Sequence, residues 1–292
     1  MPMILSAELL ATIEAQLSLI LNPIDQSTQL MDAMRYSALS GGKRIRPLLV
    51  IAAGRLSAAD TSIVMQVGCA LELLHCYSLI HDDLPAMDDD DLRRGLPTCH
   101  VKYGEATAIL AGDALQTRAF EILSTPQLGI DAKIQLQLVN LFAKCAGAGG
   151  MVGGQALDLM SNGHKMDLVS LQYMHSLKTG CLIQAAILAG YLCGKHVDQG
   201  VYQQLEICAK RLGLLFQIMD DILDVTEDSA TLGKTANKDF LQDKATYVSV
   251  LGLEQARKEA AALYTKIIDE LSILKNSDEL IELVQLVYNR HN

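Results

Sequence analysis

Apolar residues recur every three or four positions along most of this chain, a spacing typical of α-helices. One such stretch lies near the start, with apolar side chains at Leu9, Ile13, Leu17 and Leu21. Another begins at about Ser277 and continues, as an amphipathic pattern, to the end of the chain. Alternating patterns joined by Asn-Gly or Asp-Gly turns, which indicate β-hairpins, are nearly absent. The sequence therefore predicts an all-α fold of roughly ten or more helices.

The composition favours one large domain over residues 1–292. The chain contains six prolines and no Ser/Gly-rich linker that would separate two domains. Half of its 292 residues are apolar, which is enough to bury a large core and excludes wholesale disorder. The formal net charge is -10, which argues against a protein that binds nucleic acid through phosphate contacts.

The sequence also predicts a cytoplasmic protein that is not bound to a membrane. The most apolar stretch, residues 181–194, is shorter than the ~18 residues needed to cross a bilayer. The first residues carry Glu8 and Glu14 and no basic residue, so they do not resemble a signal peptide. Seven cysteines, an odd number without a Cys-x-x-Cys pair, are typical of reduced and buried thiols.

Residues 75–95, which read HCYSLIHDDLPAMDDDDLRRG, form the first of two acidic clusters. Six carboxylates fall within ten positions, at Asp82, Asp83, Asp88, Asp89, Asp90 and Asp91. Such crowding needs cations, and hard oxygen ligands at this density favour Mg²⁺. His75, Ser78 and Asp82 share one helical face, and a bulge or kink at Pro85 would return Asp88 to that face. A solvated acidic turn or a Ca²⁺ loop is the alternative interpretation.

The second acidic cluster lies in residues 215–224, LFQIMDDILD. Gln217, Asp220, Asp221 and Asp224 have i, i+3, i+4, i+7 spacing and form one stripe on a helix. The stripe could be a surface feature that pairs with lysines. Together, however, the two clusters could face each other across a cavity and hold a small set of Mg²⁺ ions bridged by phosphate oxygens of a substrate.

Basic residues near these clusters suggest an anionic partner such as a diphosphate. Residues 41–47, GGKRIRP, supply three cations after a glycine pair, although the segment could be an ordinary helix start. Arg93 and Arg94 follow the first acidic cluster, and guanidinium groups bind phosphate in a bidentate manner. Lys234 belongs to a third basic stretch, and Lys178-Thr179-Gly180 interrupts another helical pattern.

These motifs, in this order, resemble those of the short-chain trans-isoprenyl diphosphate synthases. The likeness covers nearly the whole chain and includes LPTCHVKYGEATAILAGDALQ at 96–116 and GGQALDL at 153–159. It is closest to the bacterial members that make farnesyl diphosphate. The resemblance implies an all-α bundle of the isoprenoid synthase type around a deep central cavity. It also implies a homodimer that binds isopentenyl and allylic diphosphates, with three Mg²⁺ ions when substrate is bound.

The resemblance also implies roles for individual residues. The metal ligands would be Asp82 and Asp88, with Asp83 nearby, and Asp221, with Asp220 and Asp224. Four residues match positions that bind isopentenyl diphosphate: Lys43, Arg46, His75 and Arg94. Five match positions that bind the allylic diphosphate: Arg93, Lys178, Thr179, Gln217 and Lys234. The Lys178 carbonyl and the Thr179 and Gln217 side chains would stabilise the allylic cation, and the terminal residues 290–292 would help to close the site.

The implied reaction is head-to-tail addition of isopentenyl diphosphate to dimethylallyl and then geranyl diphosphate. Tyr77 lies five positions before Asp82, about 7.5 Å along a helix, where its ring would stop the growing chain at fifteen carbons. In the family, an aromatic there together with the Pro85-Ala86 insertion goes with this product. The helical wheel instead puts Ser78 on the Asp82 face, and Tyr77 could be an ordinary core residue.

Other functions remain open at this stage. The product could have ten or twenty carbons, as in geranyl or geranylgeranyl diphosphate synthases. His81-Asp82 is compatible with an HD-type metal phosphohydrolase, although the second acidic cluster contains no histidine. A class I terpene cyclase would share the first acidic motif without needing a second diphosphate site. An inactive regulatory subunit of a prenyltransferase is the non-enzymatic alternative, against which the intact aspartates and arginines argue.

Overall fold

The computed structural model describes residues 4–22, 28–161, 166–226 and 245–289. The longer helices are α1 (Ala7–Ile20), α2 (Gln29–Ala38), α3 (Ile45–Leu56), α4 (Thr61–Asp82), α6 (Glu105–Ser124), α7 (Ala132–Ala146), α8 (Met151–Ser161), α9 (Leu168–His175), α10 (Cys181–Leu192), α11 (Gln199–Thr226), α15 (Leu253–Ser272) and α16 (Asp278–Tyr288). Short segments join them: α5 (Cys99–Tyr103), α14 (Tyr247–Leu251), the 3₁₀ turn η1 (Pro126–Leu128) and the π-helical turn η2 (Ser176–Gly180).

In the described residues, β structure is limited to a two-stranded antiparallel ribbon, β1 (Leu92–Arg93) and β2 (Leu96–Pro97). The all-α prediction is therefore confirmed. The expected helices at the two ends of the chain are present as α1 and α16. Polar caps define the helix starts, because a side-chain oxygen satisfies a free backbone N–H there. Ser6 accepts from Leu9 at the start of α1, and Asp60 accepts from Ser62 at the start of α4.

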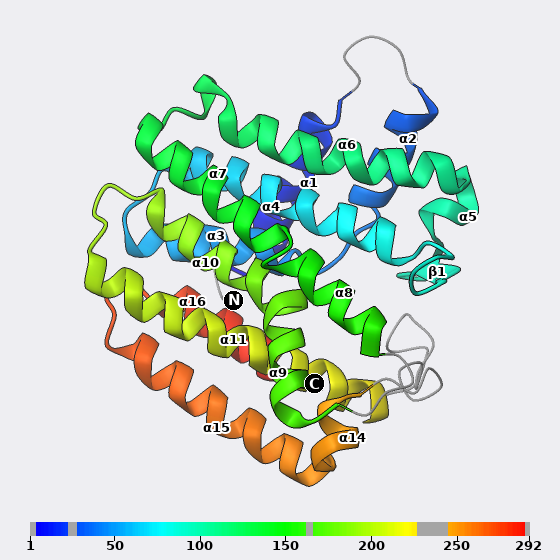
Figure 1. The fold of residues 1–292 in the computed structure, drawn as a ribbon. Coiled ribbons are helices and arrows are strands. Elements are labelled where there is room, and N and C mark those ends of the chain that lie inside the picture. The colour runs from blue at the N-terminus through cyan, green and yellow to red at the C-terminus, as the bar shows by residue number, and fades with distance from the viewer. Residues whose placement is uncertain (1–3, 23–27, 162–165, 227–244, 290–292) are drawn as a thin grey trace.

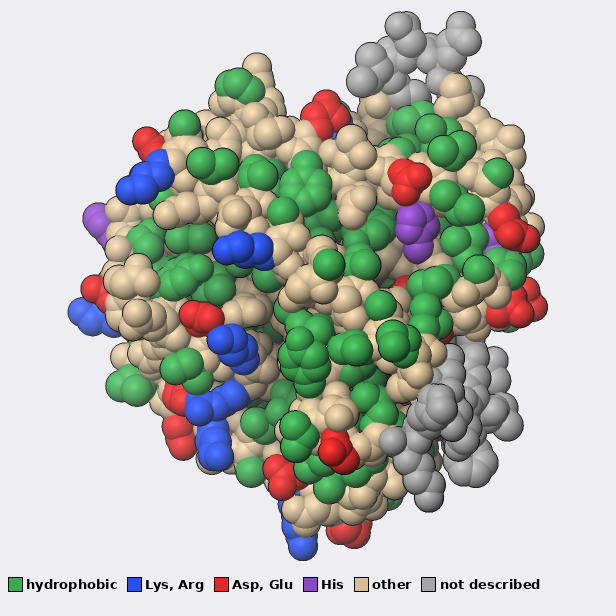
Figure 2. Space-filling view, in the orientation of Figure 1, with side chains coloured by type: hydrophobic (Ala, Val, Ile, Leu, Met, Phe, Trp, Pro, Cys, Tyr) green, Lys and Arg blue, Asp and Glu red, His purple; other side chains and the backbone are tan. Residues whose placement is uncertain are grey.

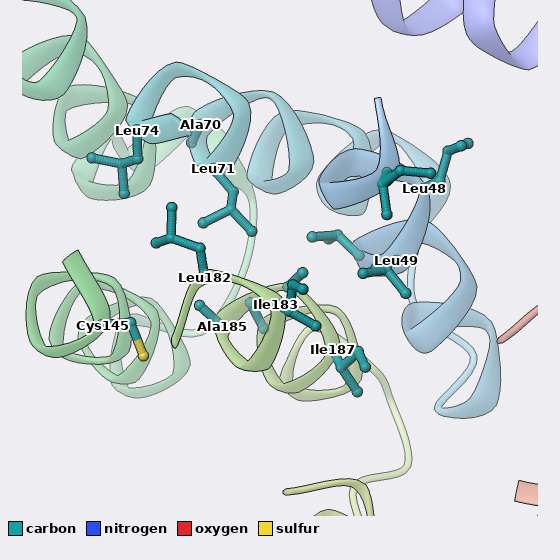
Figure 3. Packing of buried hydrophobic residues seen from close by; sticks show 14 of the residues in the cluster. Leu48, Leu49, Ala70, Leu71, Leu74, Cys145, Leu182, Ile183, Ala185 and Ile187 are labelled. Atoms are coloured by element: carbon teal, nitrogen blue, oxygen red, sulfur yellow. The ribbon is translucent and has the colours of Figure 1, made fainter. Parts of the chain in front are cut away.

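The core is centred on α4, which packs against α3, α6 and α10 (Figure 1). Figure 3 shows Leu182 and Ile187 of α10 directed toward side chains of α3 and α4, among them Leu49 and Leu71. Leu49, Leu71 and Leu182 are each about 1% exposed or less, and burying a side chain of this size contributes ~1.5–3 kcal/mol. This packing fixes α4 as the rigid support for everything at its C-terminal end.

Helix α4 is apolar over most of its length. By length and composition it could span a membrane, although Gln66, Glu72 and His75 interrupt its apolar residues. In the structure, 78% of its most apolar window is buried inside the protein. A helix that is apolar on all sides is also what the centre of a large helical core requires. The burial of α4 therefore explains its composition without a membrane.

The cysteines are arranged as predicted from their apolar surroundings. All seven lie in described segments and none forms a disulfide, and all but Cys181 are buried. Burial raises the pKa of the Cys69 and Cys76 thiols to about 12, so both are neutral near pH 7. They act as small apolar side chains of α4.

Candidate active site

The first acidic cluster folds back on the end of α4. The helix ends at Asp82, and the Asp88 N–H donates to the Asp82 carbonyl over 2.8 Å. The Asp90 N–H donates to the Asp83 carbonyl over 3.1 Å, and Asp89 has a left-handed backbone with φ 50°. The expected return of Asp88 to Asp82 is therefore present. It comes from a turn after the helix rather than from a kink within it.

Asp83 is directed to Arg93 on β1. Its carboxylate is buried and accepts a hydrogen bond from Arg93 Nε over 2.9 Å. Burial raises the pKa of Asp83, and the Arg93 guanidinium opposes that rise. Arg93 also lines the cavity between the two acidic clusters. The ion pair thus fixes an arginine at the edge of that cavity.

The second acidic cluster is tied into a hydrogen-bonded chain. Asp221, on α11, is 2% exposed and accepts from Gln217 Nε2 over 2.8 Å and from the Tyr247 N–H over 2.7 Å. Gln217 Oε1 in turn accepts from the Thr179 hydroxyl over 3.0 Å. These bonds connect the π-helical turn η2 to α11 and α14. They hold Thr179, Gln217 and Asp221 in one fixed arrangement.

Two glycines bring η2 close to its neighbours. A Cβ at Gly154 of α8 would lie 2.2 Å from the Lys178 backbone nitrogen. A Cβ at Gly213 of α11 would lie 2.6 Å from Gly180 Cα. Because both clashes would be with backbone, only glycine fits at these positions. The π-helical turn that interrupts the helical pattern at Lys178-Thr179-Gly180 is therefore clamped on two sides.

The two acidic clusters line one cavity, here called the central cavity, of about 320 Å³. Its carboxylates come from Asp88, Asp90, Asp158, Asp220 and Asp221. Its cations come from Arg46, Arg93 and Lys178. Opposite charges converge here from the acidic turn, α3, α8, α11 and η2. The prediction that the two clusters face each other across a cavity is confirmed.

A second cavity, the basic cavity, adjoins the first and has a volume of about 430 Å³. Four predicted diphosphate-binding residues line it: Lys43, Arg46, His75 and Arg94. The Arg94 guanidinium lies against bare backbone, since a Cβ at Gly42 would be 2.8 Å from its Cζ. Gly42 also has a φ of 127°, which side chains rarely adopt.

Arg44, the middle cation of the 41–47 segment, forms buried internal ion pairs. It is 2% exposed, and its guanidinium donates to Glu14 over 2.6 Å and to Glu72 over 2.8 Å. The interpretation of this segment as three cations for an anionic partner was therefore too broad. Arg44 anchors α1 and α4 to the start of α3, while Lys43 and Arg46 face the basic cavity.

A third cavity, the apolar cavity, has a volume of about 350 Å³ and lies between α4 and α8. Tyr77, Ser78 and Asp82 of α4 line it together with apolar residues that include Met87, Met151, Val152, Ala156 and Leu159. The helical wheel favoured Ser78 alone on this face, but both residues reach the cavity. Arg46 and His75 line all three cavities and mark the point where they meet.

Burial raises the pKa of Asp82 and lowers the pKa of His75, two residues that line the apolar cavity. Burial raises the pKa of Asp82 to about 6, with Lys178 opposing the rise and Asp88 adding to it. Burial also lowers the pKa of His75 well below its usual value, and the nearby Arg46 and Arg94 lower it further. His75 is therefore neutral near pH 7 and donates or accepts hydrogen bonds without adding charge.

The donor set fits Mg²⁺ that binds together with a phosphorylated ligand. Within the described segments, no three His, Cys, Asp or Glu side chains are close enough to hold a metal ion alone. Mg²⁺ commonly takes one or two carboxylates and completes its octahedral shell with water and substrate phosphates. Carboxylates spread over two walls of one cavity suit that mode. They do not suit an ion enclosed entirely by protein ligands.

Sequence reasoning missed three residues of the site. Asp158 of α8 is 6% exposed, lines the central cavity and forms an ion pair of 2.5 Å with Lys178. Gln155 lines the apolar cavity, and His175 lines the central cavity and stacks on Tyr247. The stretch 153–159 contains two of them, so its likeness to the family could have assigned them a role. Lys234 and residues 290–292 lie outside the described residues.

The chain is similar to known proteins over most of its length. Residues 27–287 match the family described as polyprenyl synthetase. The farnesyl diphosphate synthase of Escherichia coli (strain K12) is 50% identical over 239 residues, which cover 82% of this chain and 80% of that protein. A chloroplastic geranylgeranyl pyrophosphate synthase of Catharanthus roseus is 41% identical over 272 residues, which cover 92% of this chain and 76% of that protein.

Solved structures are similar over nearly the whole chain. An apo FPP/GFPP synthase from Zymomonas mobilis has a TM-score of 0.86 at 39% identity and covers 96% of both chains. A geranyltransferase from Helicobacter pylori, complexed with magnesium and isoprenyl diphosphate, has a TM-score of 0.84 at 34% identity. This second match covers 98% of both chains.

Proposed function

The chain belongs to the polyprenyl synthetase family, and we propose that it acts there as a farnesyl diphosphate synthase. It adds isopentenyl diphosphate to dimethylallyl diphosphate and then to geranyl diphosphate. One observation carries this proposal above the others. The central cavity, with its paired acidic walls, adjoins both a basic cavity and an apolar one, and Arg46 and His75 line all three. A chain-elongating enzyme needs these three spaces: one for the reacting diphosphate, one for the second diphosphate and one for the growing tail.

Asp82, Asp88 and Asp221 are the proposed Mg²⁺ ligands, with Asp220 and Asp224 beside them, and three ions are expected with substrate bound. The magnesium in the Helicobacter pylori structure supports a metal in this fold. When bound, the ions supply positive charge that stabilises the leaving diphosphate. Asp83 acts through its ion pair, because it fixes the orientation of Arg93.

The residues of the chain bind the allylic substrate and stabilise the charge that develops on it. Arg93 and Lys178 bind its diphosphate, together with Lys234. The C–O bond breaks with both electrons going to the diphosphate, which leaves an allylic cation. The Lys178 carbonyl and the Thr179 and Gln217 oxygens direct their dipoles at that cation. The hydrogen bond between Thr179 and Gln217 supports this role, because it fixes both oxygens before the reaction begins.

The basic cavity holds the second substrate next to the cation. Lys43, Arg46 and Arg94 bind the diphosphate of isopentenyl diphosphate, and neutral His75 contributes a hydrogen bond. The terminal carbon of its double bond attacks C1 of the allylic cation and forms the new C–C bond. A proton then leaves the product, and the departing diphosphate accepts it. Close positioning is essential, since water would otherwise capture the cation.

Metal binding should depend on the protonation of Asp82. Because the pKa of this carboxyl is raised to about 6, it is largely ionised at pH 7.5 and protonated at pH 5. A proton competes with a metal ion for the same oxygens. We expect the affinity for Mn²⁺, measured by electron paramagnetic resonance with inorganic diphosphate present, to fall as the pH drops through 6. Asp82→Asn should flatten this dependence, and an unchanged slope would show that Asp82 is not a ligand.

Product length is assigned to Tyr77 and Ser78, which line the apolar cavity. Tyr77→Ala removes a ring from that cavity and should allow chains of twenty carbons or more to form. Chromatography of the dephosphorylated products, made from dimethylallyl and isopentenyl diphosphates, measures this change. An unchanged fifteen-carbon product would remove Tyr77 as the residue that stops elongation. Wild-type products of ten or twenty carbons would instead favour a geranyl or geranylgeranyl diphosphate synthase.

The same assay separates the remaining alternatives. An inactive regulatory subunit would incorporate no labelled isopentenyl diphosphate. A terpene cyclase would release hydrocarbon, and an HD-type phosphohydrolase would release phosphate without forming a C–C bond. The basic cavity argues against both, because neither reaction has a second diphosphate to hold.

We also propose that the enzyme is a homodimer of single-domain chains in the cytoplasm. Large apolar side chains are exposed on α6, α7 and α8: Ile109, Leu110, Leu136, Val152 and Met160. Figure 2 shows hydrophobic side chains spread over the face of the molecule that it displays. Exposed apolar groups on adjacent helices are typical of protein contact surfaces. The unpaired cysteines support a reducing compartment. Light scattering by the purified chain tests the dimer.

A further inference from the structure

A recess in α6 receives the imidazole of His81, the residue that precedes Asp82 on α4. A Cβ at Gly112 would lie 2.1 Å from His81 Nε2 and 2.5 Å from its Cδ2. The imidazole therefore occupies space that a side chain on α6 would otherwise fill. His81 Nε2 lies 3.1 Å from the Ile109 carbonyl oxygen, a distance that suits donation from Nε2–H. Glycine and this carbonyl together hold the ring against α6.

The recess also affects Tyr77, because the ring of His81 packs against the ring of Tyr77. The two rings form an edge-to-face pair with centroids 5.8 Å apart and an interplanar angle of 78°. Both residues line the apolar cavity, and Tyr77 is only 4% exposed. The histidine ring thus packs against the tyrosine ring, and it occupies space that is open because position 112 has no side chain. Gly112 itself lies behind His81 and does not line the cavity.

We propose that His81 is a specificity-determining residue for the length of the allylic tail and that Gly112 is its positioning residue. The inference rests on the proposed function and deepens it. With the recess present, the imidazole is withdrawn from the cavity and leaves space for a ten-carbon tail. With the recess filled, the ring is forced away from α6 and into the cavity. When the His81 ring moves, its edge-to-face contact with Tyr77 is also lost.

Gly112→Ala tests the proposal because the two allylic substrates reach different depths. Dimethylallyl diphosphate occupies only the part of the cavity next to the diphosphate. Geranyl diphosphate extends one five-carbon unit further and would meet the displaced ring. We expect kcat/KM for geranyl diphosphate to fall about tenfold, while kcat/KM for dimethylallyl diphosphate stays within about twofold. The product should shift toward ten carbons.

A matched control and a rescue variant separate this effect from general damage. Gly149→Ala is the control, since a Cβ there would meet nothing within 4 Å. It should leave the ratio of the two kcat/KM values unchanged. Gly112→Ala/His81→Ala has no ring to displace and should recover the use of geranyl diphosphate relative to dimethylallyl diphosphate. His81→Ala alone enlarges the cavity and should give some product longer than fifteen carbons.

The outcomes distinguish this inference from the proposed function. A wild-type protein that forms no prenyl product from either allylic substrate would overturn both. If the wild type makes farnesyl diphosphate, an unchanged kcat/KM ratio in folded Gly112→Ala overturns the inference alone. Equal loss with both substrates overturns it as well. Should Gly112→Ala not fold, the product spectrum of His81→Ala decides, and a spectrum identical to that of the wild type overturns the inference.

Discussion

Asp82→Ala and Asp221→Ala should each lower kcat by about 10²–10³-fold, because each removes charge stabilisation at the leaving diphosphate. Steady-state incorporation of labelled isopentenyl diphosphate at saturating Mg²⁺ measures this loss. Glu254→Ala is the control: it removes an exposed carboxylate of α15 that lines none of the three cavities and pairs with Arg257 over 3.6 Å. Near-normal turnover in either cavity variant would refute the assigned role.

The same two variants should differ in stability, which separates chemistry from folding. Enclosure raises the pKa of Asp82 to about 6, so the fold disfavours its ionised form at neutral pH. Removing that carboxyl should not lower the melting temperature of the metal-free protein. Asp221 accepts bonds from Gln217 and Tyr247, and its removal leaves two donors unsatisfied at a cost of about 1–3 kcal/mol. Equal activity loss with unequal melting temperatures is the expected pattern.

Chelation should abolish prenyl transfer and leave the fold intact. Excess EDTA is expected to reduce product formation to background, and excess Mg²⁺ should restore it. The far-UV circular dichroism spectrum should not change. This combination follows from the donor set: the described residues form no three-ligand protein site, so the ions serve the substrate rather than the fold. Undiminished coupling in EDTA would disprove the metal assignment.

The sequence predicts the helices and the two acidic clusters, because helical spacing determines which side chains share a face. It also predicts that the two clusters line one cavity. It could not predict partners across space. Arg44 looks like any other cation of its segment, and only the tertiary structure shows Glu14 and Glu72 on either side of it. Similarly, Asp83 reads as another carboxylate of the cluster, although it binds Arg93.

Helical wheels also proved too strict around the apolar cavity. Ser78 lies on the Asp82 face by angle, while Tyr77 lies beside it, but a long aromatic side chain reaches a cavity that a short one at the same angle would miss. Asp158 gave no separate signal, because one carboxylate in an apolar stretch has no spacing pattern. Its role becomes visible only through the ion pair with Lys178.

The clamp that Gly154 and Gly213 form around η2 restricts how this enzyme can be altered. Neither residue faces a substrate, yet a methyl group at either would collide with the backbone that carries Lys178 and Thr179. In a library that randomises whole helices, most variants would therefore carry a substitution at Gly154 or Gly213 that displaces this backbone. Both glycines therefore have to be kept, together with the cavity-lining residues, when α8 and α11 are redesigned.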